Sequence, residues 1–237
     1  MSVVATVPRR RLAAPGHALR STGVLPLSFA FAAGAATVLA FAPFSLAGLP
    51  VLSLALLFVL WQRATPGSAG WLGFAFGGGL FGTGVPWLVL ALHTYGGMAA
   101  PLAVIAVAGL CAYLALFPAL AGFVACRWSR PGTMARLYAA AGAWTLAEWA
   151  RSFVLTGFPW LSLGYAQLPA GAATPLAAYA PLGGVFLVTL CSALASVALA
   201  AAIDAAATGS WRQCVAPIAV AAAVFGAGIA LDRIEWT

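Results

Sequence analysis

Glu148 and Arg151 carry opposite charges and lie three positions apart in a strongly apolar segment, just before Gly157-Phe-Pro-Trp160. On a helix this spacing places both side chains on one face. A charge inside a bilayer costs at least about 2.5 kcal/mol, so such residues usually pair or face a polar cavity. The pattern predicts a mutual ion pair that fixes the helix, or a polar wall for a lipid headgroup, because a guanidinium can bind two phosphate oxygens. The two interpretations are compatible.

Aromatic residues and a histidine in two expected loops extend this candidate site. Aromatic rings are common at any membrane interface, and a lone interfacial histidine is usually a hydrogen-bonded structural group. We nevertheless expect these loops to lie on the same side of the membrane as the charged pair. The sequence then predicts a lipid-binding mouth made of His93, Tyr95, Glu148, Arg151, Phe158, Trp160 and Tyr165.

The other residues capable of chemistry form no catalytic or metal-binding pattern. The four cysteines have no metal-ligand spacing and no histidine nearby in sequence, which is typical of packing thiols. The acids Asp204, Asp232 and Glu235 flank expected membrane spans, as ordinary solvated residues do. The sequence therefore predicts no catalytic residue, no metal site and no cofactor in this chain.

The composition is that of a polytopic membrane protein. Hydrophobic residues make up 64% of the chain and charged residues 6%, with a mean hydropathy of +1.03. A soluble domain has about 25% charged residues. The net charge of +7 comes from arginines scattered between apolar stretches, with no lysine, so we expect no nucleic-acid partner.

These apolar stretches predict an all-α transmembrane bundle, because backbone groups in lipid must bond internally. Pro and Gly clusters divide the chain into about seven spans. We predict a basic tail at residues 1–23, a helical membrane domain at 24–233 and the start of a further region at 234–237. The predicted spans are Val24–Phe41, Leu46–Trp61, Trp71–Leu92, Leu102–Cys126, Leu137–Leu155, Leu176–Ile203 and Val215–Leu231.

Arginine positions predict the orientation of this bundle. All but Arg151 and Arg233 fall on one side of the predicted spans. The positive-inside rule makes that side cytoplasmic, so we expect the N-terminus inside and the C-terminus outside or periplasmic. A cleaved signal peptide ending near Ala42 is an alternative for the first span, although Pro43 would directly follow the cut.

Glycines in the third expected span predict close helix contacts. Gly73/Gly77 and Gly78/Gly82 each form a step of two small residues four positions apart. Such steps allow helix backbones to approach closely. A phosphate-binding loop would need a preceding strand and, in the P-loop, a lysine. The sequence shows neither here, so we expect these glycines to serve helix packing.

A series of short motifs over residues 24–236 resembles the membrane domain of the apolipoprotein N-acyltransferase family. The series, in chain order, is Phe41-Ala-Pro-Phe44, Gly73-Phe-Ala-Phe-Gly77, His93-Thr-Tyr-Gly-Gly-Met98, Ala112-Tyr-Leu-Ala-Leu-Phe117, Glu148 with Arg151, Thr156-Gly-Phe-Pro-Trp-Leu161, Gly164-Tyr-Ala-Gln167 and Ala180-Pro-Leu-Gly-Gly184. The resemblance implies a multi-pass protein of the bacterial inner membrane. It also implies an enzyme that moves an acyl chain from a phospholipid donor to the N-terminal diacylglyceryl-cysteine of a lipoprotein.

The resemblance further implies a Glu-Lys-Cys triad in a nitrilase-like domain after the seventh span, and no residue of this chain matches that triad. We therefore expect this chain to be a fragment that is inactive alone. Two other functions were weighed. The chain could anchor a polyprenyl-phosphate mannosyltransferase, or it could be a small transporter, although no internal repeat is visible.

Overall fold

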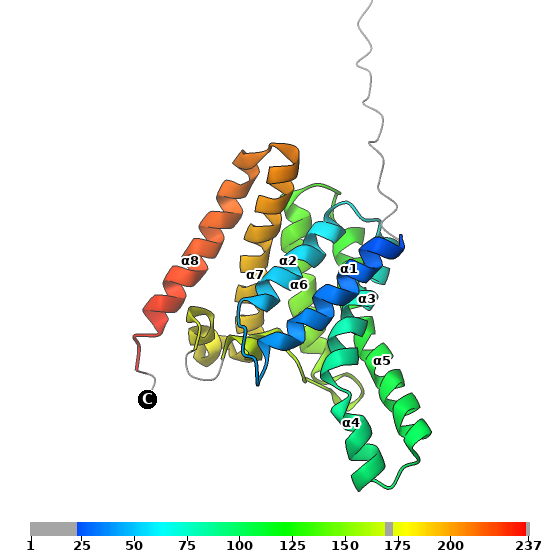
Figure 1. The fold of residues 1–237 in the computed structure, drawn as a ribbon. Coiled ribbons are helices and arrows are strands. Elements are labelled where there is room, and N and C mark those ends of the chain that lie inside the picture. The colour runs from blue at the N-terminus through cyan, green and yellow to red at the C-terminus, as the bar shows by residue number, and fades with distance from the viewer. Residues whose placement is uncertain (1–22, 169–172, 236–237) are drawn as a thin grey trace, which may run out of the picture.

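The chain folds into helices joined by short connections, as Figure 1 shows for the computed structural model. The structure describes residues 23–168 and 173–235, so most of the predicted basic tail and the last two residues lie outside it. Within those ranges no strand occurs, and the all-α prediction is confirmed. The helices are α1 (Val24–Thr37), α2 (Leu49–Gln62), α3 (Pro66–Gly84), α4 (Trp87–Leu90), α5 (Ala100–Arg127), α6 (Met134–Arg151), α7 (Ala180–Thr208) and α8 (Val215–Leu231).

Two of the predicted spans end differently in the structure. The predicted span Trp71–Leu92 is not one straight helix, because α3 and the segment Trp87–Tyr95 meet at an angle of 49°. Pro86 lies at this break; proline has no N–H to donate and disfavours the helical conformation of the residue before it. The span predicted to end at Leu155 instead ends with α6 at Arg151.

Only some helices are long and apolar enough by themselves to cross a membrane. Among the described residues they are Ala100–Arg127, Pro175–Thr208 and Trp211–Leu231, with the bent α3–α4 pair as a possible fourth. The helices α1 and α2 are apolar but shorter, and α6 carries three charged residues. A membrane protein is therefore supported, while seven crossings and the orientation of the termini stay predictions.

Close backbone contacts hold α3 between α1 and α5. A Cβ atom on Gly73 would lie 2.2 Å from the carbonyl oxygen of Pro118 in α5. On the other face, a Cβ on Gly79 would lie 2.0 Å from the carbonyl oxygen of Phe31 in α1. The Gly73/Gly77 prediction is thus confirmed. The Gly78/Gly82 prediction is wrong, because Gly82 is exposed and Gly79 makes the contact instead.

Arg136, in the first turn of α6, is a buried charge. It is 2% exposed, and its guanidinium donates hydrogen bonds to the carbonyl oxygens of Ala64 (2.9 Å), Cys126 (3.1 Å) and Ser129 (2.7 Å). The last carbonyls of a helix lack intrahelical partners and carry partial negative charge. Arg136 therefore joins the ends of α2 and α5.

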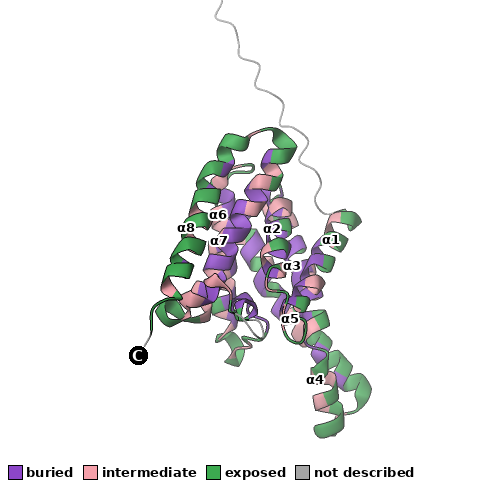
Figure 2. Cartoon of the chain, turned by 60° about the vertical axis from the view of Figure 1, so that its left-hand side comes forward, coloured by how far each residue is buried: buried purple, intermediate pink, exposed green. Residues whose placement is uncertain are grey.

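The connections lie at two opposite ends of the bundle (Figure 1). The α2–α3, α5–α6 and α7–α8 connections share one end, which we call the arginine-rich end because it carries Arg63, Arg127, Arg130, Arg136 and Arg212. The α1–α2 and α6–α7 connections share the opposite end. Figure 2 shows buried residues concentrated in the middle of the bundle, whereas α8 and α4 are largely exposed. The candidate site is built at the end opposite the arginines.

Candidate functional site

The segment after α6 has an unusual backbone. Leu155, Thr156 and Leu161 have φ values of 48°, 75° and 59°, in the left-handed region that residues with side chains rarely adopt. Gly157 has φ of 80°, and a Cβ there would lie 2.0 Å from the carbonyl oxygen of Ser152, so only glycine fits. Each strained residue costs about 1–3 kcal/mol and needs support from surrounding contacts.

Arg151 supplies part of that support from the last turn of α6. Its Nη1 donates to the carbonyl oxygens of Phe158 and Trp160, the latter at 2.7 Å. Its Nη2 donates to Ser162 Oγ at 3.0 Å. The guanidinium also lies over the Phe81 ring, 5.2 Å from its centre. Arg151 thereby fixes three successive points of the loop that follows its own helix.

Glu148 holds the far end of the same loop. Its Oε1 accepts a hydrogen bond from the Leu163 backbone N–H at 3.0 Å, and its Oε2 accepts one from Thr189 Oγ1 at 2.8 Å. The Thr189 hydroxyl in turn accepts from the Gly164 N–H at 3.0 Å. One carboxylate therefore joins α6, α7 and the loop, and we call Glu148 and Arg151 with their partners the loop clamp.

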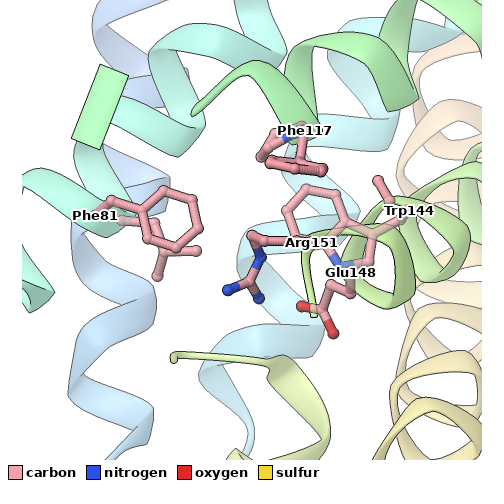
Figure 3. Close-up of a pocket in the computed structure, with 8 residues that line it drawn as sticks. Phe81, Phe117, Trp144, Glu148 and Arg151 are labelled. Atoms are coloured by element: carbon pink, nitrogen blue, oxygen red, sulfur yellow. The ribbon is translucent and has the colours of Figure 1, made fainter. Parts of the chain in front are cut away.

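The predicted mutual ion pair of Glu148 and Arg151 is wrong. The one ion pair within 4.0 Å in the described ranges joins Arg63 to Asp204 at 3.1 Å. Figure 3 shows the guanidinium and the carboxylate turned toward the loop from the same helix. Backbone groups of the loop take the place of an opposite charge, and so both charges are satisfied without touching each other.

Neither charged side chain reaches a space that could hold a headgroup. Glu148 is 4% exposed and Arg151 2%. The cavity that both border, shown in Figure 3, has a volume of about 10 Å³, which is room for about one water molecule. In this structure the two residues contact the loop and not a headgroup-sized space, and their role as a headgroup wall stays a prediction.

A much larger cavity lies on the other side of this loop. Its volume is about 700 Å³, and it is bordered by the end of α1, the α3–α4 break and the loop itself. Trp87 and Trp160 both line it and contact each other, with ring centres 5.4 Å apart. The lining residues are Val38, Phe41, Ala42, Gly84, Trp87, Phe158, Pro159, Trp160, Leu161 and Tyr165. We call this space the aromatic cavity.

The structure brings together part of the predicted mouth. Phe158, Trp160 and Tyr165 line the aromatic cavity, while His93 and Tyr95 do not. These two lie in the π-helical turn Ala91–Tyr95 that follows α4, both exposed, and His93 Nδ1 hydrogen-bonds to the Met98 carbonyl oxygen at 2.8 Å. The bend at Pro86 directs this turn away from the bundle, as Figure 1 shows for α4.

Sequence reasoning missed several residues of the site. Phe41 belongs to a motif that we quoted and Trp87 lies at the start of α4, but no spacing rule places either beside the α6–α7 loop. Thr189 looks like any threonine in an apolar helix, and its role depends on α7 packing against the loop. In the part of the chain that the structure describes, no three His, Cys, Asp or Glu side chains gather as metal ligands would.

Comparison with known proteins gives this geometry a family context. Residues 33–198 match the family described as the apolipoprotein N-acyltransferase N-terminal domain. The chain is 45% identical over 222 residues to an apolipoprotein N-acyltransferase of Nitrosomonas europaea, covering 91% of this chain and 42% of that protein. It is also 45% identical over 206 residues to one of Chromobacterium violaceum, covering 86% and 38%, and 39% identical over 212 residues to one of Vibrio parahaemolyticus, covering 89% and 40%. The chain thus spans about two fifths of the length of these curated relatives.

Proposed function

Because this chain belongs to the apolipoprotein N-acyltransferase family, we propose that it is the membrane part of an enzyme that acylates lipoproteins. In this proposal the acyl chain moves from a membrane phospholipid to the N-terminal diacylglyceryl-cysteine of a lipoprotein, at the outer face of a bacterial inner membrane. The chain crosses that membrane several times. None of the reacting groups is assigned to these residues.

The aromatic cavity is the observation that carries the proposal. Both substrates have acyl tails, and moving a tail into water costs about 0.8 kcal/mol per CH₂ group. A cavity of about 700 Å³ lined by five aromatic rings keeps part of a tail in apolar surroundings. The residues that line it lie at the end of the bundle opposite the arginine-rich end. The positive-inside rule places the arginine-rich end in the cytoplasm, so in this proposal the cavity is on the outer side. In this role the cavity holds a lipid near the membrane surface for the reaction.

The loop clamp serves this cavity indirectly. Phe158, Trp160 and Leu161 form one wall, and Arg151 and Glu148 hold the backbone on either side of that wall. A preorganised wall lowers the cost of binding, because fewer groups must be ordered when the lipid enters. In this proposal Glu148 and Arg151 are positioning residues, and the aromatic rings contact the lipid.

A photoactivatable phospholipid with a diazirine in its acyl tail tests the proposal. We expect light to attach the lipid chiefly to residues of the aromatic cavity, with mass spectrometry locating the adducts. Trp160→Ala should lower this labelling several-fold, because it removes a large apolar contact surface. Trp128→Ala is the matched control, because Trp128 is also exposed but lies at the arginine-rich end. Labelling spread evenly over exposed helices such as α8, or unchanged in Trp160→Ala, would contradict a lipid-binding cavity.

The two other functions weighed from the sequence gain no support. The family match and the relatives point to acyl transfer, and none of their names refers to a mannosyltransferase or a transporter.

A further inference from the structure

A second apolar depression lies on the outer surface of the bundle, between α3 and α5. Its volume is about 340 Å³, and several of its side chains are exposed, including Trp71 at 62%. We call it the α3–α5 groove. Its lining residues are Gly67, Gly70, Trp71, Phe74, Leu116, Ala119, Leu120 and Phe123. It is separate from the aromatic cavity, and the two share no lining residue.

The groove forms on the outward face of α3 and α5, where the first residues of α3 are glycines. A Cβ on Gly73 would lie 2.2 Å from α5, and one on Gly70 would lie 3.6 Å from the carbonyl oxygen of Ala119. A Cβ on Gly67, one turn nearer the start of α3, would meet nothing within 4 Å. The two backbones also stay close on the inner side nearer the arginine-rich end, where a Cβ on Gly122 would lie 2.6 Å from the carbonyl oxygen of Ala69. The groove is thus a depression on the outer side of this helix pair, and Gly67 and Gly70 leave its α3 wall without side chains at that end.

Arg127 places a positive charge at the arginine-rich end of the α3–α5 groove. Arg127 follows Phe123 by four residues in α5, so the two lie on the same face, one turn apart. Arg127 is exposed, and within the described ranges it makes no hydrogen bond or ion pair through its side chain. Among the other arginines at this end, Arg63 pairs with Asp204 and Arg136 binds backbone carbonyls, whereas Arg130 and Arg212 are exposed and do not line the groove. An apolar groove capped by an uncompensated arginine matches a lipid with a negatively charged headgroup.

We propose that the α3–α5 groove binds an anionic phospholipid of the leaflet at the arginine-rich end. One acyl chain lies against Trp71, Leu120 and Phe123, and the headgroup phosphate binds the Arg127 guanidinium. Arginine suits this contact because its fork of N–H groups matches two phosphate oxygens. Anionic lipids are concentrated in the cytoplasmic leaflet, where the positive-inside rule places this end. The site is independent of the acyl-transfer function, because it needs only a membrane-embedded bundle.

Competition between two lipids with identical acyl chains tests this site. The purified chain is equilibrated in nanodiscs with phosphatidylglycerol and phosphatidylcholine, and native mass spectrometry counts the lipids it retains. We expect the wild type to retain phosphatidylglycerol preferentially. Arg127→Gln should reduce that preference about fivefold, the effect of one basic residue near a charged membrane. Gly67→Leu should also reduce retention, because its side chain occupies the groove without a backbone clash.

Arg130→Gln is the matched control, since Arg130 is another exposed arginine, three residues beyond the end of α5, but lies outside the groove. It should retain phosphatidylglycerol as the wild type does. Equal losses in Arg127→Gln and Arg130→Gln would overturn the site in favour of general charge attraction. Equal retention of both lipids by the wild type would overturn the anionic preference. Thermal unfolding in the same nanodiscs checks that all variants are folded. A variant that has lost its transition is replaced by Arg127→Ala or Gly67→Val, for which the same losses are expected.

Discussion

Buried charges in this protein are satisfied mainly by backbone groups. Arg136 donates to carbonyls at the ends of α2 and α5, and Arg151 donates to carbonyls of the loop after α6. Glu148 accepts from the Leu163 N–H and from the Thr189 hydroxyl. A desolvated charge is costly unless its hydrogen-bonding capacity is filled, and backbone dipoles can fill it as well as an opposite charge can. Each of these residues therefore fixes chain segments that have little regular structure of their own.

Replacing Arg151 tests whether the hydrogen bonds of one buried charge hold the loop after α6. Arg151→Met removes the donors to Phe158, Trp160 and Ser162, and the strained loop loses about 2–4 kcal/mol of support. We expect amide hydrogen exchange of residues 158–163 to become about 100-fold faster in hydrogen-exchange mass spectrometry. Exchange in the middle of α5 should not change. Arg233→Met, which removes an exposed charge beyond α8, serves as the control. Unchanged exchange in the loop of Arg151→Met would contradict the loop clamp.

At the scale of helices, the contacts of α3 determine how the bundle packs. Gly79 and Gly73 lie on opposite faces and bring α3 against α1 and α5. Its end is set by Val85 and Pro86, after which the chain turns by 49°. This bend opens the space beside Trp87 that becomes the aromatic cavity. One helix therefore provides both the tight centre of the bundle and one boundary of the site.

Two alanine substitutions in α3 separate close packing from helix propensity. Gly79→Ala places a Cβ about 2.0 Å from the Phe31 carbonyl oxygen, so α1 and α3 must move apart. We expect a loss of about 1–3 kcal/mol in the free energy of unfolding, measured by thermal or denaturant unfolding in detergent. Gly82→Ala meets nothing within 4 Å and should be neutral or stabilising by up to about 1 kcal/mol. Equal effects of the two substitutions would show that α1 and α3 do not pack as described.

At the scale of the whole molecule, the helices place chemically different connections at two opposite ends of the bundle. Most of the arginines among the described residues lie at one end of the bundle, where the α2–α3, α5–α6 and α7–α8 connections meet (Figure 1). The aromatic cavity is lined by residues that follow α1 and α6, at the other end. A protein with this asymmetry is expected to have one orientation in the membrane, because translocating several arginines is unfavourable. The proposed function requires the aromatic end to be outside.

Labelling of single cysteines in intact cells tests that orientation. In a variant whose native cysteines are replaced by serine or alanine, Thr94→Cys should react with a membrane-impermeant maleimide. Arg130→Cys should react only after the cells are permeabilised. Both positions are exposed, so accessibility of the side chain does not differ between them. Labelling of Arg130→Cys alone in intact cells would mean that the bundle is inverted. The proposed role of the aromatic cavity at the outer face of the membrane would then be wrong.

The sequence by itself determined the class of this protein and much of its element order. Apolar composition forces backbone groups to bond within helices, and so all-α structure follows from chemistry alone. The Gly73/Gly77 contact and the presence of Phe158, Trp160 and Tyr165 in one site were also predictable, because they depend on local spacing. The family resemblance came from short motifs that are likewise local.

Only the tertiary structure decided which charged side chains are buried and which groups they hydrogen-bond. Spacing puts Glu148 and Arg151 on one helix face, but it does not say that a strained loop folds back between them and takes their hydrogen bonds. In the same way, nothing local distinguishes Arg136, which is buried, from the exposed Arg130. These outcomes depend on contacts between segments distant in sequence, because the cost of burying a charge is set by whatever groups the fold brings to it.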